Sequence, residues 1–156
     1  MFFNLPPQII IFLLSMLPVG EKVAIPVAIK VYGLSPWESF VITVIGSFIP
    51  TIAIVYLMGP ISEFFSKRFI KVKKLFDWLF YHTRKRHTKY FDIFKELSLL
   101  VFVSIPSPIT GPWGGALASF VFGIPPKKAL PFIFGGCFIS GIIITFLTQG
   151  ATILFK

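Results

Sequence analysis

Pro18-Val19-Gly20-Glu21-Lys22 decides the fold, because it lies between two short apolar runs, residues 9–19 and 23–34. Proline removes a backbone hydrogen-bond donor and glycine weakens a helix, so the chain is expected to turn here. Apolar runs of about 10 to 14 residues are typical of segments that enter a membrane without crossing it. The sequence therefore predicts a re-entrant helical hairpin over residues 9–34.

A second interrupted stretch has the same form. The apolar runs at residues 97–105 and 113–124 flank Pro106-Ser107-Pro108-Ile109-Thr110-Gly111-Pro112, which predicts a second hairpin over residues 97–124. The residues expected to break the hairpins are Pro18, Gly20, Pro26, Pro106, Pro108 and Pro112. The alternative is that both stretches cross the membrane as kinked helices, which gives a bundle of four complete spans.

Two longer stretches carry no charge, residues 39–58 and 129–155. At a rise of about 1.5 Å per residue, each can cross a hydrocarbon core of roughly 30 Å. We place the two transmembrane helices at residues 37–60 and 127–155. The 156 residues are 55% hydrophobic and 13% charged, so the chain is expected to be a single all-α integral membrane domain, residues 1–156.

The two halves align without a gap at an offset of ninety residues. Identical pairs are Pro18/Pro108, Ala28/Ala118, Gly33/Gly123, Pro36/Pro126, Gly46/Gly136, Phe48/Phe138, Ile49/Ile139, Ile52/Ile142, Ile54/Ile144 and Leu57/Leu147. Each unit, residues 9–60 or 97–155, is a hairpin followed by one span. A unit crosses the membrane once, so the second is inverted, as in many secondary transporters. The alignment also places Glu21 opposite Gly111, so both hairpin tips should meet.

Positive charge is concentrated between the units. The net charge is +9, and ten basic residues lie between Lys67 and Lys95. The positive-inside rule places this linker, residues 61–96, in the cytoplasm of a multi-pass cell-membrane protein. Its alternating apolar and basic residues predict an amphipathic helix at the membrane surface, which favours anionic lipid over nucleic acid as the partner. The predicted headgroup contacts are Lys67, Arg68, Lys71, Lys73 and Lys74.

Ionisable groups at the first tip are the best candidates for a functional site. Glu21 and Lys22 are the only charges in residues 1–28, and such groups are expensive inside a membrane. A buried carboxylate tends to take up a proton, so Glu21 is a candidate for proton coupling, and Lys22 could neutralise it or hold an anion. The alternative is an ordinary ion pair in a surface loop.

The second tip offers Ser107, Thr110, Gly111 and Trp113. Thr110 is suited to cap a helix whose first residue is Pro112. Such a helix would point its free N–H groups at the middle of the membrane and attract an anion. A proline and glycine kink without a ligand is the alternative.

Other polar residues give no cofactor or metal site. His82 and His87 lie among cations in the linker, which disfavours a metal. Cys137 stands in an apolar span and is expected to pack there. No catalytic set of side chains is expected at membrane depth, so we do not predict an enzyme. The small residues Gly135, Gly136 and Gly141 permit close helix pairing and a homodimer.

Both loops resemble those of one known family. Leu17-Pro18-Val19-Gly20-Glu21-Lys22-Val23-Ala24-Ile25-Pro26 resembles the Pro-x-x-Glu-x-Arg-Gly-x-Ile-Pro loop of the small multidrug export proteins. Ile105-Pro106-Ser107-Pro108-Ile109-Thr110-Gly111-Pro112-Trp113-Gly114-Gly115-Ala116-Leu117 resembles the Pro-x-Pro-x-Thr-Gly-x-Trp-x-Gly-Ala loop of that family. The likeness covers nearly the whole chain.

The resemblance extends to the DedA (VTT-domain) proteins, whose members are thought to have paired re-entrant hairpins and several of which are linked to lipid movement. It implies a flippase or scramblase for lipid or polyprenyl-phosphate headgroups, with proton coupling. Two departures stand out. The arginine of the first motif is replaced at best by Lys22, and the second hairpin lacks the DedA arginines. A transporter of small solutes, drugs or ions, and a non-transport membrane-organising protein, stay open as alternatives.

Overall fold

The computed structural model describes residues 5–84, 89–107 and 111–154, and every regular element in these ranges is an α-helix. The helices are α1 (Pro7–Ser15), α2 (Gly20–Lys30), α3 (Pro36–Arg68), α4 (Ile70–Arg84), α5 (Lys89–Ser104), α6 (Pro112–Phe122) and α7 (Pro126–Leu154). The prediction of an all-helical chain is confirmed for these residues.

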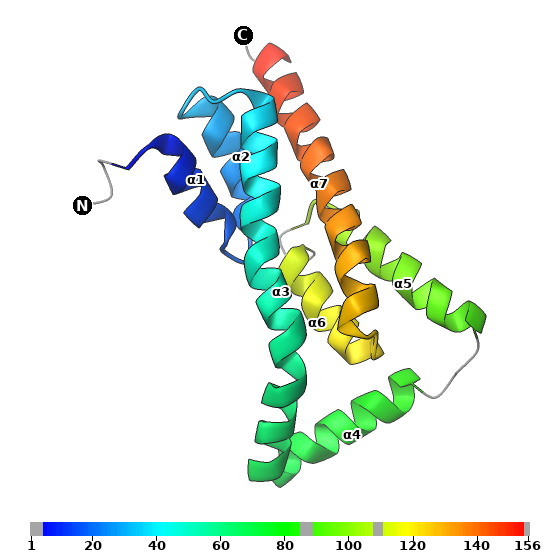
Figure 1. Cartoon of the computed structure of the whole chain (residues 1–156). Helices are drawn as coiled ribbons and strands as arrows, with labels where there is room; N and C mark the ends of the chain where they lie inside the picture. The colour runs from blue at the N-terminus through cyan, green and yellow to red at the C-terminus, as the bar shows by residue number, and fades with distance from the viewer. Residues whose placement is uncertain (1–4, 85–88, 108–110, 155–156) are drawn as a thin grey trace.

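Two of the helices are long and apolar enough to cross a membrane, within Pro36–Phe64 of α3 and Pro126–Ala151 of α7. They contain the uncharged stretches at residues 39–58 and 129–151. In Figure 1, α3 and α7 lie side by side and run in opposite directions. Both helices carry large exposed apolar side chains, among them Ile45, Leu57, Phe138 and Phe146. An apolar exterior of this extent is what a lipid environment requires.

The short helices form two pairs beside these long helices. The pair α1 and α2 packs against one half of α3, and the pair α5 and α6 packs against the opposite half of α7 (Figure 1). The helix α4 joins the end of α3 to the second pair and lies at the end of the bundle, away from α1 and α2. Its Lys71, Lys73, Lys74 and Trp78 are all exposed.

Several helix boundaries differ from those expected. Helix α3 continues through Pro60 to Arg68, so residues 61–68 extend the first long helix. Residues 89–96 of the expected linker belong to α5. Helix α2 continues through Pro26, so the prediction that Pro26 breaks the first hairpin is wrong. A proline inside a helix removes one hydrogen bond, and packing against neighbouring helices keeps the helix intact.

Each short pair is connected to its long helix through a left-handed glycine. Gly33 has φ 64° and Gly123 has φ 69°, and these are the only residues with positive φ in the described chain. Helix α3 then begins with a capping box. The Ser35 N–H donates to Glu38 Oε2 at 3.2 Å, and the Glu38 N–H donates to Ser35 Oγ at 3.2 Å.

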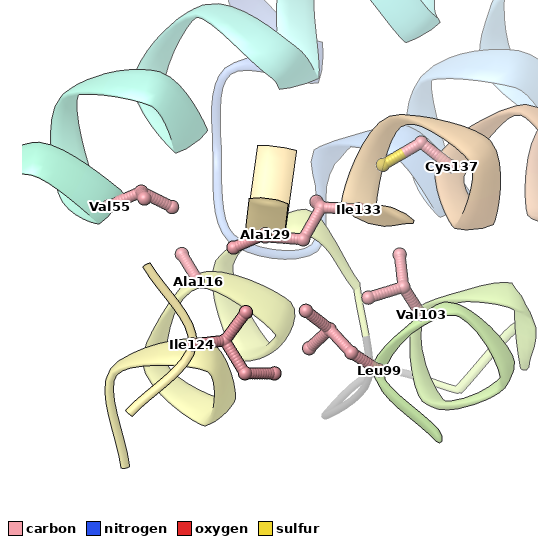
Figure 2. Packing of buried hydrophobic residues seen from close by; sticks show 8 residues of the cluster. All are labelled: Val55, Leu99, Val103, Ala116, Ile124, Ala129, Ile133 and Cys137. Atoms are coloured by element: carbon pink, nitrogen blue, oxygen red, sulfur yellow. The ribbon is translucent and has the colours of Figure 1, made fainter. Parts of the chain in front are cut away.

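The larger apolar core lies between α3, α5, α6 and α7. Figure 2 shows its eight buried members, which are Val55, Leu99, Val103, Ala116, Ile124, Ala129, Ile133 and Cys137. Cys137 is free and fully buried, which confirms its expected role in packing. A smaller core of Ile11, Ala24 and Ala28 holds the first pair together.

Glycines let the helices approach closely within the chain. A Cβ on Gly136 would come within 2.6 Å of Val103 Cβ, and one on Gly141 within 2.8 Å of the Phe40 ring. A Cβ on Gly46 would meet the Ser15 hydroxyl. The small residues that were expected to pair two copies of the chain are thus occupied, at Gly136 and Gly141, by contacts within one copy.

Candidate functional site

The first hairpin turns over residues 16–19, between α1 and α2. Pro18 lies in this turn and Gly20 is the first residue of α2. A Cβ on Gly20 would lie 2.7 Å from the Ser15 Cα and would also collide with the Leu14 carbonyl oxygen. Only glycine fits such a tight reversal without a backbone shift, so Gly20 fixes where α2 begins.

The second turn lies between α5 and α6. Pro106 and Ser107 are outside both helices, and the Ser107 N–H donates to the Ile105 carbonyl at 2.8 Å. Pro108 and Thr110, both predicted at this tip, fall outside the described residues. The N-cap of α6 is Gly111, one residue later than the predicted Thr110, and no side chain among the described residues caps the helix. Pro112 occupies the start of α6 as expected.

The two tips meet. The position of a Cβ on Gly111 lies 3.5 Å from Lys22 Nζ and 3.9 Å from the Pro18 carbonyl oxygen. Residues about ninety positions apart therefore lie in contact, which confirms the expected convergence of the tips. The ammonium group of Lys22 is thereby placed at the N-terminal end of α6.

Glu21 occupies the first turn of α2 and is 3% exposed. Its carboxyl group lies near the hydroxyl of Ser140 on α7 and interacts electrostatically with the ammonium group of Lys22. Neither carboxyl oxygen forms a hydrogen bond with the described residues, and the Ser140 hydroxyl forms none either. Buried polar atoms without protein partners are rare, and water or an ion commonly satisfies them.

Two further buried polar atoms lack partners in the described chain, Thr43 Oγ1 on α3 and Trp113 Nε1 on α6. Thr43 is next to Val44, and Val44 contacts Gly141, the neighbour of Ser140. Thr43 and Ser140 therefore stand at the same level of the two long helices. Four helices thus each contribute one unpartnered polar group, on Glu21, Thr43, Trp113 and Ser140.

Sequence reasoning found Glu21 and Trp113 but missed Thr43 and Ser140. A signal for Thr43 was present in the spacing of the hydroxyl residues along α3. Ser39, Thr43, Ser47 and Thr51 recur every four residues and are all buried. The other three donate to backbone carbonyl oxygens of α3 or of the residue before it, so Thr43 alone of the four is left without a partner.

The basic residues predicted to contact lipid headgroups lie away from the junction of the two tips. Lys67 and Arg68 end α3, whereas Lys71, Lys73 and Lys74 are on α4. All five are exposed, and α4 is at the far end of the bundle from α1 and α2 (Figure 1). Apart from these, Lys128 on α7 pairs with Glu96 on α5 at 3.1 Å. Within the described ranges no group of three or more acidic, histidine or cysteine side chains could hold a metal ion.

Comparison with known proteins gives one family match. A family model described as "Putative small multi-drug export protein" matches residues 21–143. No curated protein and no solved structure gave a match. The family match begins at Glu21, just after the first turn, and includes the Gly111 turn, all of α3 and most of α7. Because it covers well over half of the chain, the protein belongs to the small multi-drug export protein family and is a membrane protein.

Proposed function

We propose that this protein is a membrane transporter whose cargo passes the junction of the two hairpin tips. The observation that carries the proposal is Glu21, a carboxyl group that is 3% exposed and has no hydrogen-bond partner in the described chain. It lies beside Lys22, where the second tip arrives. Ionisable groups at membrane depth usually line the path of a substrate or a coupling ion.

The proposed architecture is an inverted repeat of a re-entrant hairpin and a span. Helices α2 and α6 have 11 residues each and are roughly 16 Å long, about half of the hydrocarbon core. The long helices begin at Pro36 and Pro126, ninety residues apart, and run antiparallel. Gly33 and Gly123 provide the same left-handed connection in both units. These features support hairpins that enter from opposite faces and meet in the middle.

The proposed cargo is the anionic headgroup of a lipid or polyprenyl phosphate, moved as in DedA-like flippases or scramblases. The support is chemical. Lys22 lies at the N-terminus of α6, where no described side chain caps the helix, and both the lysine and the helix end favour an anion. A lysine offers a point charge and no bidentate fork, so recognition should depend on charge more than on phosphate geometry.

Glu21 is the proposed site of proton coupling. A carboxyl group beside Lys22 can alternate between a charged form that pairs with the lysine and a neutral form that releases it to an anion. Loss of the proton at Glu21 and loss of the anion at Lys22 would then be linked. In this proposal the protein is a carrier, not an enzyme, and takes no cofactor.

Transport in reconstituted vesicles tests the proposal. The Glu21→Gln variant should move a fluorescent anionic lipid without the proton-gradient dependence of the unchanged protein. The Glu63→Gln variant changes an exposed carboxylate near the end of α3 and should behave as the unchanged protein. Normal, gradient-dependent transport by Glu21→Gln would contradict the coupling role.

A drug exporter is the second candidate, and one surface favours it. A pocket of about 380 Å³ between α3 and α7 is lined by Trp37, Phe40, Phe138, Phe146 and other mostly apolar side chains. Aromatic walls of this kind accept flat apolar molecules. Uptake of an apolar dye by the same vesicles, lost in Phe138→Ala, would support this candidate over lipid transport.

A further inference from the structure

A groove leads away from the tip junction along the outside of the bundle. It has a volume of about 350 Å³ and lies between α2 and α7. Lys22, Pro26 and Lys30 of α2 form one wall, at a spacing of four residues that keeps them on one helix face. Ile144, Leu147 and Thr148 of α7 line the other wall.

The groove is cationic at both ends and apolar between them. Lys22 is half-buried at the tip, and Lys30 is exposed in the last turn of α2. Eight residues of helix separate the lysines by roughly 12 Å. That length is close to half of a hydrocarbon core of roughly 30 Å. No acidic residue is among the described residues that line the groove.

The fold does not require these lysines. At the corresponding boundary between the two units, α6 lies against α3 and leaves a groove of about 250 Å³, lined by residues such as Val55, Tyr56 and Phe120. Phe120 stands ninety residues after Lys30, and the described lining of this second groove contains no charged residue. Packing of the two units against each other is therefore compatible with an uncharged groove.

Interaction with the membrane surface does not account for Lys30 either. Lys67 and Arg68 end α3 and three further lysines of the linker lie on α4, whereas α2 ends at the opposite end of the bundle from α4 (Figure 1). A lysine there lies away from the face to which the positive-inside rule assigns excess basic charge.

We propose that the groove between α2 and α7 is a binding site for an amphiphilic anion, with Lys30 as its outer contact and Lys22 as its inner one. The anionic head would bind a lysine, and the alkyl chain would lie against Ile144 and Leu147. Lipophilic cations are repelled by both lysines. The proposal rests on the transporter function proposed above and adds the path by which the cargo reaches the tips.

Calorimetric titration of the purified protein in a neutral detergent tests this directly, without any transport step. Hexyl phosphate is the probe. Hexyltrimethylammonium is the matched cation, and inorganic phosphate is the same head without a chain. We expect hexyl phosphate to bind, inorganic phosphate to bind at least about tenfold more weakly, and the cation not to bind.

Variants assign the site. Lys30→Gln should weaken hexyl phosphate binding about five- to tenfold, Lys30→Arg should retain it, and Lys127→Gln, an exposed lysine outside the groove, should leave it unchanged. Equal binding by Lys30→Gln, or equal binding of the cation, would overturn the proposal. Binding of inorganic phosphate as tight as that of hexyl phosphate would overturn the role of the apolar wall. Loss of transport with this binding intact would count only against the transporter function.

Discussion

Gly33 and Gly123 lie ninety residues apart and share a left-handed backbone, with φ 64° and 69°. Each lies between a short helix of 11 residues and a long apolar helix. A Cβ on Gly33 would have nothing within 4 Å, so any cost of substitution there comes from the backbone alone.

Substitution of these glycines should therefore have similar effects in both units. We expect Gly33→Ala and Gly123→Ala each to destabilise the protein by about 1–2 kcal/mol, because a Cβ is disfavoured in the left-handed region. Unfolding in mixed micelles measures the change. Gly59→Ala, in a helix with open space around it, is the control and should not destabilise. A neutral Gly33→Ala would show that the connection relaxes.

Adjacent glycines of α7 should differ in their tolerance of a methyl group. Gly136→Ala places a Cβ 2.6 Å from Val103 Cβ and 2.9 Å from the Leu100 carbonyl oxygen. Overpacking of this kind costs about 1–3 kcal/mol. Gly135→Ala meets only the end of the Leu100 side chain at 3.4 Å and should be tolerated. Comparison of the melting temperatures of the two variants checks this, and equal melting temperatures would contradict the close packing of α5 on α7.

The tip glycine, Gly111, should accept a small side chain and reject a large one. Its φ of 176° is extended, which any residue adopts, and a Cβ would stand 3.5 Å from Lys22 Nζ. Gly111→Ala should therefore keep both stability and transport. Gly111→Phe should separate the tips and lower transport with a smaller effect on the melting temperature. Full transport by Gly111→Phe would mean that contact between the tips is not needed.

The side of the membrane on which Lys127 lies distinguishes the proposed inverted repeat from four complete spans. Re-entrant hairpins place Lys127 in the cytoplasm and Lys30 outside, whereas four spans place both outside. We expect a membrane-impermeant maleimide to label Lys30→Cys in intact cells and to label Lys127→Cys only after permeabilisation. The native Cys137 is fully buried, so the unchanged protein should give little background. Labelling of Lys127→Cys in intact cells would contradict the hairpins.

The exposed lysines of α4 should attract the helix to anionic lipid. A spin label on Leu75→Cys, an exposed apolar position, should lie below the headgroups in anionic bilayers. Replacing Lys71, Lys73 and Lys74 by glutamine removes about 1 kcal/mol of attraction per lysine and should bring the label nearer to water. Power-saturation measurements of label depth compare the two proteins. An unchanged depth in neutral and anionic bilayers would show that charge does not hold α4 there.

Much of the helical architecture could be predicted from the sequence, because a helix that crosses lipid needs a long stretch of apolar residues without charges, and such stretches are easily recognised. Charge-free stretches predicted the two long helices, and Pro18 and Pro106 marked true turns. The boundaries were less predictable. Pro26 and Pro60 lie inside helices, where neighbouring helices compensate for the lost hydrogen bond.

Part of the candidate site was hidden for a related reason. Glu21 was evident because a charge in an apolar setting is conspicuous. Thr43 and Ser140 were not, since a hydroxyl in a membrane helix usually donates to its own backbone, as Ser47 and Thr51 do. Only the tertiary structure shows which of these hydroxyl groups has no hydrogen-bond partner among the described residues. Lys30 was overlooked because its partner surface is on α7, far along the chain.

The helix contacts inside each unit differ in kind from those between α3 and α7, and this difference bears on how the two units can move relative to each other. The end of α1 packs against α3 at Gly46, and α5 packs against α7 at Gly136. The helix backbones therefore approach each other closely inside each unit. Across the seam between α3 and α7, aromatic rings meet instead, Phe40 with Phe138 at 5.1 Å and Phe48 with Phe134 at 5.0 Å. Rings can rotate and slide where backbones cannot. Rocking of the two units at this aromatic seam would also slide α6 along α3, where Val55 belongs to the larger core, and it would expose the tips to one side and then the other.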